Sequence, residues 1–465
     1  MKNFKKILAV LAVASLSACS FIEKIPEYSE PSEISYQEEI PVVTEPVEEE
    51  EPFDISGQTI TWLADYDLNP SDGGERSVAV ALFEDVYGAK INFVRTTAEN
   101  KYTKLSEMIA GGEEVDMFPY DETSFPNGII KHWYQPLDDY FDIMGVNDGL
   151  WDDMVGAIDT FQYDGQHYVM PYDISNPVVV TYSRKLMEQE GLDDPYELYQ
   201  QGKWNWDSMM SLMRKFVDNH TGITKYGING SFGQALLASS GSTVVNYSDG
   251  KFSNNIKDKE LEKAGKFMQD LANMNLVDNN YIGHFPKDNS TLFFAMGSWA
   301  LGESNALNPE SDLMIVPFPK SPDADDNYIS CNFNARMLVR NSTKGEAVAA
   351  YIKCERIAAT QEEYKSAAKE KALITRKTAS GTVEYFVTEE QYNALQTYLD
   401  TGVPMFDFAY GMGEKMNGNG DYTYKTKGVM NNMTDSIING TVESWEKFCD
   451  EWTGVIDDTV KEFNK

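Results

Sequence analysis

The chain has 465 residues, enough for two domains of ordinary size, and a formal net charge of −35. A chain this acidic binds nucleic acid poorly, because phosphate contacts require clustered Lys and Arg, and anionic lipid repels it. The composition therefore excludes a nucleic-acid-binding face and a basic membrane-binding face, although net charge says nothing about the fold.

The first nineteen residues form a basic start, a short apolar run and a small-residue ending. Lys2, Lys5 and Lys6 precede the apolar residues 7–16, a run well below the ~20 residues that a membrane span needs. This pattern predicts a secretory signal peptide over residues 1–18. The ending Leu-Ser-Ala-Cys resembles the lipobox of bacterial lipoproteins, which implies that Cys19 is lipidated and anchors the protein to the outer face of the cell membrane.

Residues 19–56 contain the lipobox cysteine and a segment rich in Pro and Glu. Five prolines and a run of four glutamates at 48–51 leave almost no apolar periodicity. Because Pro limits collapse and like charges extend a chain, we predict a disordered tether that holds a folded body away from the membrane.

Strand and helix patterns alternate from residue 57 onward. We predict strands at 58–63, 89–94 and 115–118, with helices at 78–87 and 101–110 between them. The second helix stops at a Gly-Gly pair, which is a common C-terminal signal. This β-α-β-α-β order predicts a parallel sheet with right-handed crossovers.

The same alternation continues through the rest of the chain. We predict strands at 168–171, 178–182, 313–316 and 336–340, and helices at 206–217, 261–274, 345–357 and 436–463. The last helix carries Trp445, Phe448, Trp452 and Ile456 on one face. Trp204 and Trp206, at the start of a helix, are interpreted as packing residues.

The sequence contains no recognisable catalytic or metal-binding motif. The four histidines, at 132, 167, 220 and 284, form no HExxH, and the chain has no GxSxG, P-loop or Rossmann glycine pattern. Beyond Cys19 there are only Cys331, Cys354 and Cys449, which is not a disulfide framework, although one pair could bridge. We therefore predict no enzyme activity, no cofactor and no metal.

Seven short segments follow one another in a characteristic order. They read NKYTKLSEMIAGG at 100–112, QPLDD at 135–139, DGQHYVMPY at 164–172, VVVTYSRKL at 178–186, GKWNWD at 202–207, FAMGSWALG at 294–302 and IVPFP at 315–319. In order and spacing they resemble the extracellular solute-binding proteins of family 1, the carbohydrate group that feeds ABC importers. The resemblance extends from about residue 57 to 360.

This resemblance implies an α/β fold with two lobes and a hinged cleft between them, like the periplasmic binding proteins. Lobe 1 would comprise 57–174 and about 328–385, and lobe 2 would comprise 175–327 and about 386–465. A mono- or oligosaccharide would bind in the cleft, close the lobes by hinge motion, and be delivered to the ABC permease by a monomeric protein.

The resemblance also implies a ligand-binding set. Trp299 corresponds to a tryptophan that stacks on sugar, and Asp121 to a hydroxyl-binding acid. The remaining candidates are the neighbours of these positions, the ends of strands and the segments that cross between lobes: Tyr120, Tyr172, Asp173, Trp62, Tyr66, Phe232, Gln234, Arg336 and Asn332, with Phe406, Phe408 and Tyr410 as later covers of the cleft. Residues 328–336 depart from the family, which usually has a glycine pair there, and this puts ligand contacts nearby in doubt.

Three alternatives stay open on the residues alone. The ligand could be a non-sugar solute such as a peptide, polyamine or organophosphate, although the many aromatic residues favour sugar. The protein could be a surface carbohydrate-active enzyme, since 74 acids give too many carboxylate pairs to exclude one by counting. It could also be an adhesin that feeds no transporter.

Overall fold

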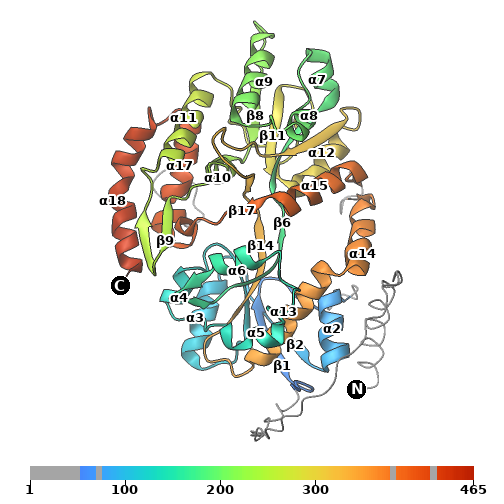
Figure 1. Ribbon diagram of the computed structural model, residues 1–465, viewed down its shortest axis with the longest axis vertical. Helices are drawn as coiled ribbons and strands as arrows, with labels where there is room; N and C mark the ends of the chain where they lie inside the picture. The colour runs from blue at the N-terminus through green and yellow to red at the C-terminus, as the bar shows by residue number, and fades with distance from the viewer. Residues whose placement is uncertain (1–52, 70–75, 378–383, 419–426, 465) are drawn as a thin grey trace, which may run out of the picture.

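Two α/β lobes, each built around its own sheet, make up the molecule (Figure 1). The structure is a computed structural model, and it describes residues 53–69, 76–377, 384–418 and 427–464. The predicted signal peptide, Cys19 and nearly all of the predicted tether lie outside the described residues. Within those residues, no helix has the length and apolarity needed to cross a bilayer.

The first lobe contains a five-stranded sheet. Its strand order is β2 (Lys90–Arg95), β1 (Thr59–Ala64), β3 (Met117–Pro119), β14 (Asn332–Leu338) and β6 (Met170–Ser175). The first three strands are parallel, as the β-α-β pattern predicted, whereas β14 runs antiparallel to both β3 and β6. Helices α2 (Val78–Tyr87), α3 (Lys101–Gly111) and α13 (Gly345–Thr360) accompany this sheet.

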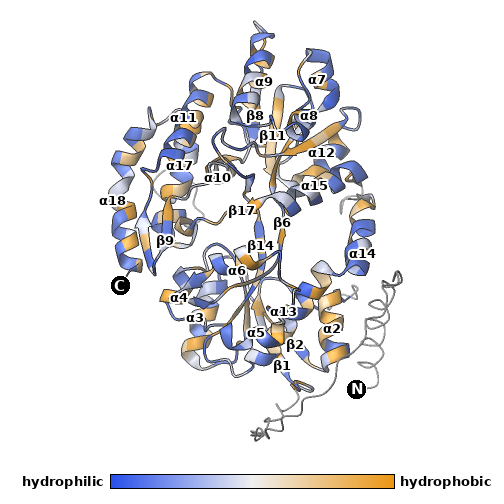
Figure 2. Cartoon of the chain, viewed as in Figure 1, coloured by the Kyte–Doolittle hydropathy of each residue, from blue (hydrophilic) through white to orange (hydrophobic). Residues whose placement is uncertain are grey.

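Strand β1 is buried on both faces. Trp62 belongs to the cluster under α2 and α13, where the Phe83 and Tyr351 rings meet at 5.4 Å, whereas Leu63 faces the opposite cluster. This alternation follows from the two-residue period of a strand, and apolar residues on both faces are typical of parallel strands covered by helices. Strands are accordingly the most hydrophobic elements, and helices turn polar faces outward (Figure 2).

The second lobe contains a four-stranded mixed sheet. Its order is β12 (Leu313–Pro317), β7 (Val178–Ser183), β11 (Thr291–Gly297) and β8 (Tyr226–Gly230). Helices α9 (Trp206–Asp218) and α11 (Lys259–Asn273) are its longest before the C-terminal region, and a capping box at Asn205 and Ser208 starts α9. Trp204 and Trp206 are buried and donate their indole N–H groups to the Pro317 carbonyl and the Ser239 hydroxyl, which confirms their packing role.

The C-terminal segment forms two helices, so the prediction of one helix over 436–463 is wrong. Helix α17 (Gly428–Ile438) ends before Asn439, and Gly440 turns the chain with φ of +73°. The Ser444 side chain then caps α18 (Trp445–Phe463). Asn439 and Gly440 are turn residues, and they end the helix even though the helical spacing of apolar residues continues beyond them.

Shorter elements complete the lobes and their connections. The helices are α4 (Asn127–Ile130), α5 (Phe141–Met144), α6 (Val155–Thr160), α7 (Arg184–Glu190), α8 (Pro195–Gln200), α10 (Gly233–Ala238), α12 (Leu301–Leu307), α14 (Glu362–Leu373), α15 (Glu389–Thr401) and α16 (Glu414–Asn417), and 3-10 turns lie at Asp138–Tyr140, Ser298–Ala300 and Phe408–Gly411. The strands are β4 (Gln162–Tyr163), β5 (Gln166–His167), β9 (Val245–Ser248), β10 (Lys251–Asn254), β13 (Tyr328–Ile329), β15 (Arg376–Lys377), β16 (Glu384–Tyr385) and β17 (Val403–Pro404). The chain crosses between the two sheets at 176–177, where β6 leads to β7, and at 330–331, where β13 leads to β14.

Candidate functional site

A cavity of about 950 Å³ opens beside the two crossing segments, mostly within the second lobe. Its floor is formed where β8 and β11 end and α10 begins, and one wall is α17. Asn176, Ser330 and Asn332 line it from the crossing segments, and Glu122 is the lining residue from the first lobe. A cavity of this size, placed where sheet strands end, is typical of small-molecule sites.

Gly230 allows the two floor strands to approach each other. Its φ is +118°, and a Cβ atom built there would lie 2.0 Å from the Ala295 carbonyl oxygen. Only glycine permits this contact, because an L side chain would clash and would also be strained at that φ. Strands β8 and β11 therefore end side by side and present their next residues to the same cavity.

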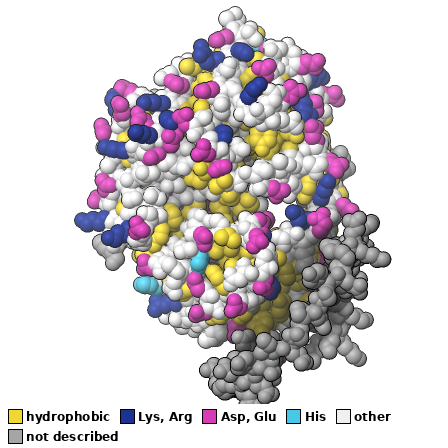
Figure 3. All heavy atoms as spheres, viewed as in Figure 1, with side chains coloured by type: hydrophobic (Ala, Val, Ile, Leu, Met, Phe, Trp, Pro, Cys, Tyr) yellow, Lys and Arg dark blue, Asp and Glu magenta, His cyan; other side chains and the backbone are white. Residues whose placement is uncertain are grey.

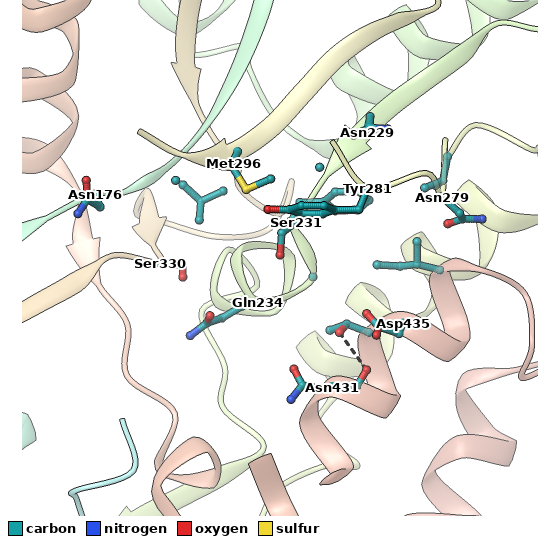
Figure 4. Close-up of a pocket in the computed structure, with 18 of the residues that line it drawn as sticks. Asn176, Asn229, Ser231, Gln234, Asn279, Tyr281, Met296, Ser330, Asn431 and Asp435 are labelled. Atoms are coloured by element: carbon teal, nitrogen blue, oxygen red, sulfur yellow. Dashed lines mark hydrogen bonds between the residues drawn. The ribbon is translucent and has the colours of Figure 1, made fainter. Parts of the chain in front are cut away.

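Amide side chains dominate the polar lining (Figure 4). The seven that contribute are Asn176, Asn229, Gln234, Asn279, Asn332, Asn431 and Asn439, with hydroxyls from Ser231, Ser330 and Thr434. An amide offers both a donor and an acceptor, and a hydroxyl does the same. The lining therefore matches a ligand whose own groups each donate and accept hydrogen bonds.

Several of these amides are held in place by backbone groups. Asn229 donates to the carbonyls of Asp278 and Asn280, at 3.2 and 2.8 Å, which fixes the loop before β11 against β8. Its Oδ1 is buried and has no hydrogen-bond partner among the described residues. Asn431 donates to the carbonyls of Asn417 and Lys427, at 2.9 and 3.1 Å. Such anchoring keeps the amides oriented before any ligand arrives.

The charges around the cavity are few and mostly paired. Lys427 forms an ion pair of 2.7 Å with Asp435 on α17, and no arginine lines the cavity among the described residues. Glu122 Oε1 accepts a hydrogen bond of 2.8 Å from Gln234 Nε2, which links the two lobes. Burial raises the pKa of the Glu122 carboxyl above its usual value, the hydrogen bond from Gln234 opposes this, and the charge of Asp121 adds to the rise.

Two exposed aromatic rings border the cavity. The Trp299 side chain is 56% exposed, and its indole lies against Gly297, where a Cβ atom would be 2.6 Å from Nε1. Tyr281 is 71% exposed, and its ring extends across the cavity near Met296 (Figure 4). Large aromatic rings left this open in a lined cavity provide flat apolar surfaces for a ligand.

The structure brings together five of the residues selected from the sequence. Trp299, Phe232, Gln234, Asn332 and Tyr410 all line the cavity. Phe232 is buried and stacks on Phe318 at 6.2 Å, so it forms the floor and offers little surface. Bulk at 328–336 does not close the crossing, because Ser330, Cys331 and Asn332 all face the cavity.

Four other candidates form a separate cluster in the first lobe. The Arg336 guanidinium is buried, lies 5.0 Å from the ring centres of both Trp62 and Tyr172, and pairs with Glu355 at 2.7 Å. Trp62 is fully buried and donates to the Tyr66 carbonyl. None of these four residues lines the cavity. Trp62 and Arg336 are buried in the first lobe, and Tyr66 and Tyr172 lie beside them.

The remaining candidates also lie outside the cavity lining. Asp121 pairs with Lys101 at 2.5 Å and accepts a hydrogen bond from the Tyr102 hydroxyl. Asp173 accepts a hydrogen bond of 3.1 Å from Asn334, and burial raises its pKa to about 6. Tyr120, Phe406 and Phe408 are packed into an aromatic cluster between the lobes.

Sequence reasoning missed the α17 wall and the loop carrying Tyr281. Asn431, Asp435 and Asn439 recur at intervals of four, which places them on one face of a helix, and this spacing was visible in the sequence. Asn279 and Tyr281 lie in a loop with no periodic pattern, so only the fold places them.

The described residues contain no group of three or more His, Cys, Asp or Glu side chains that could hold a metal ion. Cys331, Cys354 and Cys449 are all free thiols, so no bridge forms between them. The described lining offers hydrogen-bonding side chains and aromatic rings to a solute.

Comparison with known proteins gives one sequence match and many structural ones. The profile of the bacterial extracellular solute-binding proteins matches residues 79–364, more than half of the chain. No curated protein matches the chain in sequence.

Solved structures with the same fold are similar at low identity. The sugar-binding protein MalE from Xanthomonas citri has a TM-score of 0.63 at 14% identity, with 87% of this chain and 98% of that chain covered. The cyclic α-maltosyl-1,6-maltose binding protein from Arthrobacter globiformis has 0.61 at 14%, covering 87% and 99%. UgpB from Mycobacterium tuberculosis, solved with glycerophosphocholine, has 0.58 at 14%, covering 87% and 100%. These likenesses show the two-lobed fold.

Proposed function

Since this chain belongs to the family of bacterial extracellular solute-binding proteins, we propose that it captures a neutral mono- or oligosaccharide in the cavity and delivers it to the permease of an ABC importer. The observation that carries this proposal is a described lining in which seven amides outnumber four charged side chains and two aromatic rings stand open. The proposal includes binding without turnover by a monomeric protein.

A sugar suits this cavity because of how its surface is divided. Its CH groups form an apolar face that packs on a flat ring, and its hydroxyls form a rim of donors and acceptors. Trp299 and Tyr281 provide the rings, and the lining amides other than the fully buried Asn229 provide the partners. Preformed amides lose little entropy when they bind, which supports affinity.

Charged solutes suit it less well. A phosphodiester such as glycerophosphocholine calls for Arg or Lys, and Lys427, the one lysine among the described lining residues, is already paired with Asp435. A polyamine calls for free carboxylates, but the three in the described lining, Glu122, Asp278 and Asp435, already accept hydrogen bonds or pair with Lys427 within the protein. The sugar reading is therefore favoured over both.

A thermal-shift screen tests the proposal. The panel comprises glucose, galactose, maltose, maltotriose, cellobiose and galactobiose, with glycerophosphocholine, spermidine and a tripeptide as the competing classes. A ligand that binds only the folded state raises stability by RT ln(1 + [L]/Kd), or about 2.7 kcal/mol at 100 Kd. Stabilisation by a sugar, lost in Trp299→Ala, supports the proposal. Stabilisation by spermidine or glycerophosphocholine alone contradicts it.

We further propose that Cys19 carries the lipid anchor and that residues 1–18 are removed. The Leu-Ser-Ala-Cys ending of the short apolar run supports this. Intact-mass analysis of membrane-extracted protein should show acyl chains on Cys19. An unmodified N-terminus, or one downstream of Cys19, would contradict it.

A further inference from the structure

An aromatic cluster joins the two lobes beside the cavity. We call it the interlobe core and define it by Tyr120, Phe125 and Phe161 from the first lobe and Phe406 and Phe408 from the second. Phe161 and Phe406 meet at 4.8 Å between ring centres, and Phe125 and Phe408 meet at 5.8 Å. Phe125 and Phe161 are fully buried, and Phe406 and Phe408 are more than nine-tenths buried.

The contact extends along the β9–β10 hairpin. The Tyr163 ring lies 6.1 Å from the rings of both Tyr247 and Phe252, and the Tyr247 hydroxyl accepts a hydrogen bond of 3.0 Å from the Asp164 amide. Hydrophobic side chains also gather between the lobes on the visible face, whereas charges are scattered (Figure 3). Ring contacts thus run from Tyr247 in the hairpin through Phe408 to Phe406.

Backbone contact fixes the position of the lobes at this interface. Gly411 lies so close to the first lobe that a Cβ atom on it would be 1.7 Å from the Phe125 carbonyl oxygen. Close-packed rings and touching backbones adopt discrete arrangements and do not slide continuously. The interface therefore resists sliding of one lobe over the other.

Separating the lobes here would expose all of these rings to water. Because several large apolar side chains would lose their burial together, the combined cost greatly exceeds what one hydrogen bond contributes. By contrast, Glu122 and Gln234 make a single polar contact at the cavity that water can replace. Opening is therefore far cheaper at the cavity than at the interlobe core.

We propose that the interlobe core stays closed with and without solute and acts as the pivot of the hinge. The crossing segments at 176–177 and 330–331 are the second fixed connection. Two bodies joined at two separate places retain rotation about the line through them, so the lobes can rock while the interlobe core stays packed.

Hydrogen–deuterium exchange on the full-length protein without any ligand tests this. Residues 158–163 and 404–411 are expected to exchange as slowly as the central strands β7 and β11. Because no solute is used, the result is independent of whether the protein binds a sugar. Rapid exchange at both segments in the ligand-free protein, comparable to exposed loops, would overturn the proposal.

Variants sharpen the result. Phe161→Ala is expected to speed exchange at 404–411 across the interface by at least ~tenfold, and Phe406→Leu to do so to a smaller extent if the first variant folds poorly. Phe216→Ala is the matched control, because it removes an equally buried phenylalanine from the interior of the second lobe. The control should speed exchange around α9 and leave 158–163 unchanged. Equal effects of all three variants on the interlobe segments would also overturn the proposal.

Discussion

The interlobe core and the cavity lie next to each other at the boundary between the lobes, yet their chemistry is opposite. The core is built from phenylalanine rings that bury almost all of their surface, whereas the cavity is lined by amides and by rings left open to water. Apolar burial is strong and non-directional, and hydrogen bonds exchange readily with water. The comparison teaches that one boundary can hold two lobes together in one part and release a solute in another.

The largest expected effect separates the two regions by stability. Phe125→Ala should lower the free energy of unfolding by ~3–5 kcal/mol, because it leaves a hole among fully buried rings. Affinity for the sugar identified by the screen should change by less than ~tenfold. Denaturant melts and calorimetric titration measure the two. A loss of affinity as large as the loss of stability would show that the interlobe core also contributes to sugar binding.

Trp299→Ala should show the reverse pattern. Removal of the exposed indole should weaken sugar binding by ~2–4 kcal/mol, since both the apolar contact and the ring interaction disappear. Stability should hardly change, because the side chain is already 56% exposed. The same two measurements decide, and unchanged affinity with a large drop in stability would show that Trp299 is a packing residue.

Tyr281 offers a smaller effect at the mouth of the cavity. Tyr281→Ala should weaken sugar binding by ~1–2 kcal/mol, while Tyr281→Phe keeps the ring and should lose less. Tyr66→Phe is a matched control, because Tyr66 is 43% exposed but lies outside the cavity lining. Calorimetric titration of the three variants with one sugar makes the comparison. If Tyr66→Phe weakens binding more than Tyr281→Ala does, Tyr281 does not border the place where the sugar binds.

The smallest expected effect concerns the hydrogen bond between Glu122 of the first lobe and Gln234 of the second. Since burial raises the pKa of Glu122 in the folded protein, its contribution to stability is full below about pH 4.5 and is lost as pH rises through the folded pKa. Glu122→Gln removes this titration, so the variant should gain stability relative to the parent as pH rises. Thermal melts between about pH 4 and about pH 8 test the sign. A difference that is constant over this range would mean that Glu122 does not titrate as inferred.

Local patterns predicted the sheet elements but not which side of a strand faces the ligand. The alternation at 57–118 predicted three strands and two helices correctly because each element has its own period. The same pattern could not tell that Trp62 points into the cluster under α13, where Arg336 joins it, because packing on both faces is a tertiary property. The lining residues on α17 were not predicted, because they belong to a segment that resembles the family only loosely.

Trp299 and Gln234 were found through the family resemblance, which carries ligand-binding positions over to this chain. Both follow strand ends of the second lobe, where chain segments that are far apart in sequence meet at one sheet edge. The residues around Tyr281 and Asn279 meet them there only because Asn229 ties their loop to β8. A tie of this kind depends on a side-chain hydrogen bond across 49 and 51 residues, and no local pattern encodes it.

The wall formed by α17 has a consequence for how the protein matures. Residues that line the cavity run from Glu122 to Asn439, so the site does not exist until nearly the whole chain has been made. A chain that stops before Gly428 lacks one wall, however well its first lobe folds. Because such distant segments must meet, assembly of the site is a late and slow event in folding. Nascent or truncated chains therefore lack a complete site and cannot bind the solute.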